Sequence, residues 1–162
     1  MKKILSILLF VCLFVSVSKG QEVRYLTTAQ FKELVFDYTK DSVWTYKGDV
    51  PCVIDFYATW CGPCKRLAPI MEELADAYCE QVIFYKVDTD KERELAQFFQ
   101  IRSIPSILFV PVGDRPQMAV GLLPKATLEG AVDQVLLKKK ATAKACDHKC
   151  ASGQPCSGNC KH

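Results

Sequence analysis

The sequence predicts an α/β protein in which a mixed central sheet carries helices on both faces. Apolar runs at residues 52–58 and 82–87 alternate with helical patterns, and a strand, helix, strand succession of this kind implies parallel strands. Residues 52–58 are nearly all apolar, which is typical of a strand covered on both faces. Two later strand-like runs, residues 106–110 and 117–121, are separated by a Gly-Asp turn signal, which predicts a hairpin and hence an antiparallel edge.

The predicted helices follow from the spacing of apolar residues. Thr27 and Gln30 resemble a capping box, and the apolar residues that follow recur at helical intervals, so a first helix is expected there. A second helix starts at Cys61 and places its apolar residues on one stripe. Further helical patterns cover residues 91–99 and 128–136. The members of the stripe after Cys61 are Leu67, Ile70, Met71, Leu74 and Tyr78.

Length and composition indicate one compact domain with appendages. The chain has 162 residues, of which 49% are hydrophobic and 24% charged. Residues 1–20 begin with two lysines, continue with fourteen apolar or small residues and end in small residues, which predicts a secretory signal peptide. An uncleaved anchor and a lipoprotein at Cys12 are the less favoured alternatives. We therefore expect a domain over residues 21–137, a lysine- and cysteine-rich tail over residues 138–162, and a periplasmic location.

The charge distribution does not indicate a nucleic-acid-binding protein. Residues 21–137 contain 12 basic and 17 acidic residues, whereas residues 138–162 contain six lysines and one aspartate. Neither balance forms the strong basic surface that nucleic acid requires. We expect no nucleic-acid partner.

The motif W-C-G-P-C-K at residues 60–65 carries the chemistry. Cys61 and Cys64 lie one helical turn apart, where a strand passes into a helix. The helix N-terminus offers free N–H groups and a positive dipole end, which favour the thiolate of Cys61 at neutral pH. A zinc site would need a second ligand pair about 12 to 20 residues away, and Cys79 stands alone. A redox-active pair is therefore favoured over zinc or an inert bridge.

Between residues 51 and 137 the sequence resembles thioredoxin. The resemblance implies the thioredoxin-like fold and a protein-disulfide oxidoreductase without a cofactor beyond its own dithiol. It depends on the W-C-G-P-C-K motif, on Asp-Phe-Tyr-Ala at residues 55–58, on Pro69, on Ile-Pro-Ser at residues 104–106 and on Gly121.

The same resemblance implies the roles of the motif residues. Cys61 is the attacking thiolate and Cys64 the buried thiol that resolves the mixed disulfide. Trp60 and Gly62 border an exposed sulfur and let a substrate chain approach, and Pro63 fixes the turn. A plain packing role for Trp60 is the alternative.

Two sites outside the motif are expected to assist. Asp55 lies within an apolar strand, where lost hydration favours its neutral form. By resemblance it assists Cys64 and lies near Lys86 in the neighbouring strand; a purely structural Asp–Lys pair is the alternative. Resemblance also implies a cis bond between Ile104 and Pro105, whose backbone would pair with an extended substrate segment.

Gly62 and Pro63 between the two cysteines resemble the reducing members of the family. We therefore expect a monomeric reductant or exchanger of disulfides in exported proteins, kept reduced by a membrane electron donor that the sequence does not identify. The rival interpretations are a metal-binding or metallochaperone module and a structural domain that only binds partners.

The remaining cysteines leave alternatives open. The tail cysteines are expected to form two disulfides or to remain labile thiols. The alternatives are a soft site for zinc or copper(I), with His148 and His162 as further ligands, and an unstructured tail without a role. Cys52 and Cys79 are expected as buried free thiols, with a bridge between them as the alternative. The tail cysteines are Cys146, Cys150, Cys156 and Cys160.

Overall fold

The computed structural model describes residues 22–138, and it contains a five-stranded sheet of order β1-β3-β2-β4-β5. The predicted signal peptide and residues 139–162, with the four tail cysteines, lie outside the described residues. The strands are Arg24–Tyr25 (β1), Cys52–Tyr57 (β2), Ile83–Asp88 (β3), Ser106–Val110 (β4) and Gln117–Val120 (β5).

The sheet is mixed, as predicted. Strands β1 and β2 both run parallel to β3, whereas β4 is antiparallel to β2 and β5 is antiparallel to β4. The parallel pair β2 and β3 is joined through a helix, and the antiparallel pair β4 and β5 is joined by a turn in which Gly113 has a φ of 77°. The carboxyl ends of β2 and β3 therefore meet at the edge of the sheet where β4 begins.

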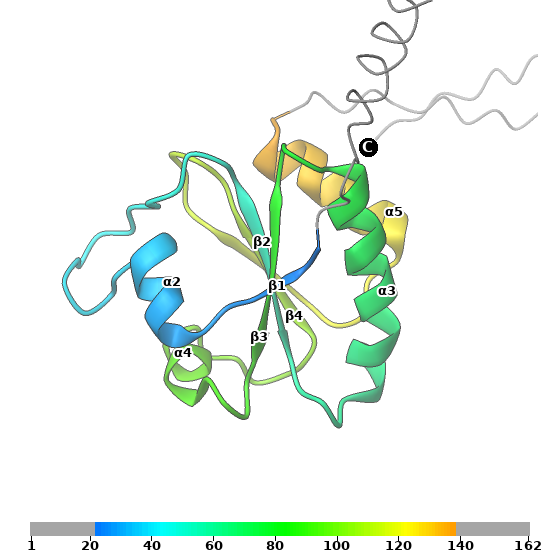
Figure 1. The fold of residues 1–162 in the computed structure, drawn as a ribbon, viewed down its shortest axis with the longest axis horizontal. Coiled ribbons are helices and arrows are strands. Elements are labelled where there is room, and N and C mark those ends of the chain that lie inside the picture. The colour runs from blue at the N-terminus through cyan, green and yellow to red at the C-terminus, as the bar shows by residue number, and fades with distance from the viewer. Residues whose placement is uncertain (1–21, 139–162) are drawn as a thin grey trace, which may run out of the picture.

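Helices cover both faces of the sheet (Figure 1). On one face lie α2 (Thr28–Leu34) and α4 (Arg93–Phe98). On the other lie α3 (Gly62–Ala77) and α5 (Lys125–Ala131), and α5 continues into a π-helical turn, η2 (Val132–Leu136). The capping box that the sequence predicts is present at the start of α2, where Thr27 and Gln30 bond to each other's backbone N–H.

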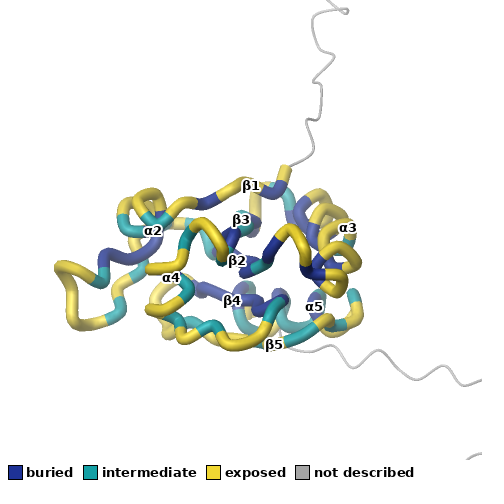
Figure 2. Tube along the Cα trace, turned by 90° about the horizontal axis from the view of Figure 1, so that it is seen from below, coloured by how far each residue is buried: buried dark blue, intermediate teal, exposed yellow. Residues whose placement is uncertain are grey.

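Alternate residues of β2 enter two separate cores. Val53 belongs to the cluster that includes Leu67 and Met71 of α3, whereas Ile54 and its alternate neighbours face the helices of the other side. Figure 2 shows β2, β3 and β4 as the buried centre of the molecule, whereas the edge strands β1 and β5 are largely exposed. The two-residue period places Asp55 on the same face as Val53, beneath α3.

Candidate active site

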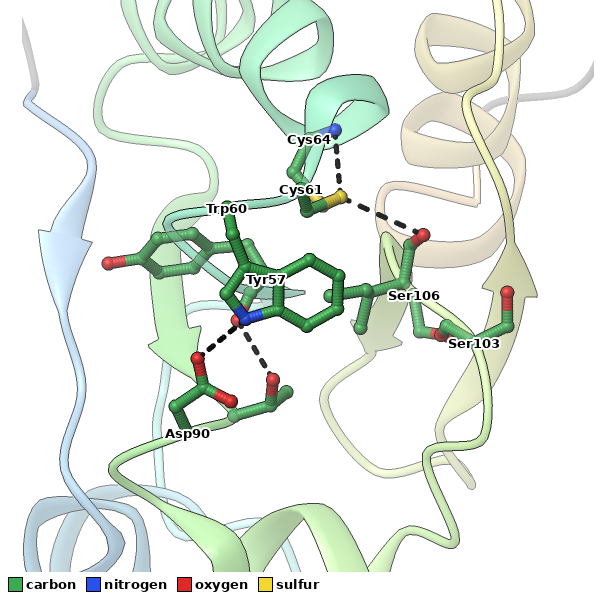
Figure 3. Close-up of a disulfide and its surroundings, with 9 residues drawn as sticks. Tyr57, Trp60, Cys61, Cys64, Asp90, Ser103 and Ser106 are labelled. Atoms are coloured by element: carbon green, nitrogen blue, oxygen red, sulfur yellow. Dashed lines mark hydrogen bonds between the residues drawn. A yellow bond between two sulfur atoms is a disulfide. The ribbon is translucent and has the colours of Figure 1, made fainter.

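The turn from β2 into α3 brings the two motif cysteines together (Figure 3). Cys61 is the N-cap residue of α3, and its Sγ accepts a hydrogen bond from the backbone N–H of Cys64 at 3.1 Å. The two sulfurs form a disulfide with an S–S distance of 2.04 Å, which is the oxidised form of the pair. When the pair is reduced, the same N–H and the positive end of α3 stabilise a negative charge on Sγ of Cys61.

Cys61 is less exposed than the sequence predicted. Cys61 is only 4% exposed and Cys64 only 3%. The cause is local packing: Cys61 forms a small cluster with Ala58 and Cys64, against which Tyr57 and Ile104 pack. Both cysteines are therefore nearly covered in the oxidised protein, and Cys64 is buried as predicted.

Trp60, the residue before Cys61, has 69% of its surface exposed, so the alternative of a core packing role is wrong. Its indole Nε1 donates to Oδ2 of Asp90 at 2.8 Å (Figure 3). Sequence reasoning missed Asp90. The only signal was its place just after β3, because the carboxyl ends of parallel neighbours meet at one edge of the sheet. Gly62 and Pro63 open α3 and are exposed.

The loop before β4 packs against Cys61 through Ile104. The Ile104–Pro105 peptide bond is cis, as the resemblance implies, and the carbonyl oxygen of Ile104 lies 3.9 Å from Sγ of Cys61 (Figure 3). The carbonyl of Pro105 accepts the N–H of Gly121 at 2.8 Å, and proline has no N–H of its own. Backbone pairing with a substrate would therefore fall to Ile104.

Asp55 is buried beneath α3 with 5% of its surface exposed. Loss of hydration raises its carboxyl pKa to about 7, and the positive charge of Lys86 opposes this rise. Lys86 is the register partner of Asp55 on β3. Asp55 can therefore hold a proton near neutral pH, which a solvated carboxyl cannot.

A small cavity of about 90 Å³ connects Asp55 with the dithiol. Cys64 and Met71 of α3 line it from one side, and Asp55 and Lys86 line it from the sheet. A volume of this size has room for a few water molecules, each of which occupies about 30 Å³ in the liquid. Asp55 and Cys64 therefore line one shared cavity that is large enough to admit water.

The described part of the chain contains no candidate metal-binding site. Within residues 22–138 no group of three or more histidine, cysteine or acidic side chains is placed to hold a metal ion. Cys52 is a buried free thiol, as expected, whereas Cys79 is free but only half-buried; the alternative of a bridge between them is wrong. The possible metal or disulfide site of the tail lies outside the described residues. No helix among residues 22–138 is long and apolar enough to cross a membrane.

Comparisons with known proteins agree with this geometry. The family model Thioredoxin matches residues 22–134. The thioredoxin of Borreliella burgdorferi is 47% identical over 107 residues, which are 66% of this chain and 92% of that protein. The chloroplastic M-type thioredoxin of Spinacia oleracea is 37% identical over 116 residues, which are 72% of this chain and 59% of that protein. The crystal structure of Malassezia sympodialis thioredoxin gives a TM-score of 0.59 at 35% identity and covers 73% of this chain and 93% of that one.

The redox-active pair at the head of α3 makes this protein a thiol–disulfide oxidoreductase that acts on protein disulfides and needs no cofactor beyond its own sulfurs. More particularly, the chain belongs to the thioredoxin family.

Proposed function

We propose that this thioredoxin is an exported reductant that cleaves disulfides in proteins outside the cytoplasm. The observation that carries the location is the arrangement of residues 1–20, with basic, apolar and small residues in the order of a secretory signal. The exposed Trp60 next to Cys61 favours an extended protein segment as the substrate, because a flat aromatic surface can support a peptide chain.

The proposed reaction is a pair of thiol–disulfide exchanges. The thiolate of Cys61 attacks one sulfur of the substrate disulfide, an S–S bond forms between protein and substrate, and the other substrate sulfur leaves as a thiolate that takes up a proton. The thiolate of Cys64 then attacks Sγ of Cys61, which releases the second substrate thiol and forms the Cys61–Cys64 disulfide. Two electrons pass from the protein to the substrate.

We propose that Asp55 accepts the proton that the Cys64 thiol loses in the second exchange. The Cys64 thiol must lose its proton before it can attack, and only 3% of its surface is exposed to bulk solvent. Asp55 lines the same cavity and is half-ionised near pH 7. It therefore serves as general base for Cys64 during reduction of the substrate and as general acid when the pair is reduced again.

The direction of electron flow follows from Gly62 and Pro63, neither of which places a charge beside the sulfurs. We expect the Cys61–Cys64 pair to have a reduction potential of about −270 mV, which is the general reference value for thioredoxin. Equilibration with glutathione redox buffers, read by intrinsic Trp fluorescence, measures it. A value near about −120 mV, that of a strong periplasmic oxidant, would contradict a reducing role. A reductant in that compartment requires a membrane electron donor, which we include in the proposal.

Export itself is tested by the mass of the mature protein. The full chain is expressed in a Gram-negative host, which is then fractionated, and intact masses are measured in each fraction. We expect a periplasmic species that begins at Gln21 and lacks residues 1–20. Recovery of the uncleaved chain in the cytoplasmic fraction alone would reject the proposed location, while leaving the oxidoreductase activity as it is.

A further inference from the structure

Three residues of neighbouring strands form a row across the sheet. Tyr25 of β1 is the register partner of Lys86 of β3, and Lys86 is in turn the register partner of Asp55 of β2. Register partners project to the same face, so all three side chains lie on the α3 side of the sheet. All three also line the cavity beside Cys64.

The side chain of Lys86 is engaged by the tyrosine. Its Nζ lies 4.2 Å from the centre of the Tyr25 ring, within the range of a cation–π interaction. Among the described residues no ion pair within 4.0 Å joins Lys86 to Asp55. Oδ1 of Asp55 is buried and has no hydrogen-bond partner in that part of the chain. Lys86 thus contacts Tyr25 and affects Asp55 only by electrostatic attraction over a longer distance.

We propose that Tyr25 is a positioning residue that holds the Lys86 ammonium group on its ring, at the rim of the cavity, and thereby withholds a close ion pair from Asp55. Tyr25 is 67% exposed on the edge strand β1, so burial of its ring does not account for this placement. The proposal deepens the proposed role of Asp55 as the proton carrier of Cys64, because it identifies what keeps that carboxyl able to hold a proton.

The other groups that face Asp55 do not supply this control. Tyr57 of β2 lies beside Tyr25, and burial raises its pKa to about 12, so it stays neutral. Glu72 and Cys64 face the cavity from α3. Cys64 does not titrate in the oxidised protein, because it is part of the disulfide. Glu72 is present in the wild type and in every variant of Tyr25 and Lys86, so it does not account for a difference between them. Among the residues of the 22–138 region that line this cavity, Lys86 is the one cation.

The consequence of removing the ring is a shift in the ionisation of Asp55. Without Tyr25 the flexible lysine side chain is free to approach the carboxylate, and a close opposite charge favours the ionised form. The strength of a cation–π contact at a partly exposed site corresponds to a fall in the ionisation midpoint of roughly half to one pH unit.

The test measures that midpoint directly in the oxidised full-length protein. The ¹³C chemical shift of the Asp55 carboxyl is followed against pH by NMR, with Asp55→Asn used to assign the signal. Tyr25→Leu and Tyr25→Gln, which both lack the ring, are expected to lower the midpoint by roughly half to one pH unit. Tyr25→Phe, which keeps the ring and loses only the hydroxyl, is expected to retain the wild-type midpoint.

A second pair of variants separates positioning from simple shielding of the cavity. In a Lys86→Met background the further change Tyr25→Leu is expected to leave the Asp55 midpoint where Lys86→Met alone puts it. An equal fall with and without the lysine would overturn the proposal, because the ring would then act by excluding water. An unchanged midpoint in Tyr25→Leu alone would overturn it too. Neither outcome depends on turnover, so the proposed function is tested separately.

Discussion

The variant Cys61→Ser is expected to reduce insulin disulfides no faster than buffer containing dithiothreitol alone. Serine is nearly isosteric, and its Oγ can still accept the N–H of Cys64 that the sulfur accepts at 3.1 Å. A hydroxyl does not ionise at neutral pH and cannot form a bond to sulfur that exchanges. Loss of the nucleophile of a covalent mechanism costs on the order of a thousandfold or more in rate.

Two further variants make this result specific. Cys64→Ser is expected to be equally inactive, yet to accumulate a mixed disulfide between Cys61 and the substrate, visible as an added mass that a reductant removes. Cys79→Ser is the matched control, because Cys79 is a free thiol outside the site, two residues beyond the end of α3. Appreciable insulin reduction by Cys61→Ser would mean that another thiol of the chain performs the attack.

Asp55→Asn is expected to slow the reaction and to stabilise the fold at the same time. An amide cannot exchange a proton with Cys64, so the second exchange should slow on the order of a hundredfold near pH 7. The first exchange does not involve Asp55. Stopped-flow measurements should therefore show normal formation of the mixed disulfide and slow resolution.

The stability change has a definite sign. The carboxyl pKa of Asp55 is about 7 in the folded protein, above its ordinary value of 3.8, so the folded state binds the proton more tightly than the unfolded chain. The stability that the neutral carboxyl contributes is complete below about pH 4 and is lost as the pH rises to about 7. The loss approaches about 4 kcal/mol above pH 7.

Asparagine carries no charge, so Asp55→Asn should escape this loss. Urea denaturation of the oxidised proteins is expected to give similar free energies of unfolding at pH 4 and a more stable variant at pH 8. Equal stabilities at pH 8 would mean that the carboxyl is solvated when ionised. An unchanged rate of resolution would remove Asp55 from the mechanism and leave it only a structural effect.

The features that the sequence predicted are those encoded locally. The capping box of Thr27 and Gln30 and the hairpin turn at Gly113 each depend on a few neighbouring residues. The dithiol at the head of α3 is likewise contained in six consecutive residues. The position of Asp55 within the apolar run of β2 indicated a buried carboxyl. Asp55 could reach the other face of the sheet only if the register of the whole strand shifted.

The features that the sequence could not predict depend on how separate segments meet. Asp90 is one acidic residue among several after β3, and only the fold brings it to the indole of Trp60. No pattern in the sequence singled out Tyr25, and only the register of β1 and β3 places it beside Lys86. The burial of Cys61 depends on Ile104, which is 43 residues away in the chain. No local sequence pattern predicts any of these contacts.

The most direct test of the catalytic role of Cys61 is the alkylation rate of each cysteine in the reduced, folded protein. Iodoacetamide is applied briefly at pH 7, and peptide mapping measures the extent of modification at every position. We predict that Cys61 reacts first, on the order of tenfold or more faster than Cys79, because the head of α3 favours its thiolate. Reaction of Cys61 no faster than Cys79 would contradict the claim that its sulfur is ionised in the reduced protein.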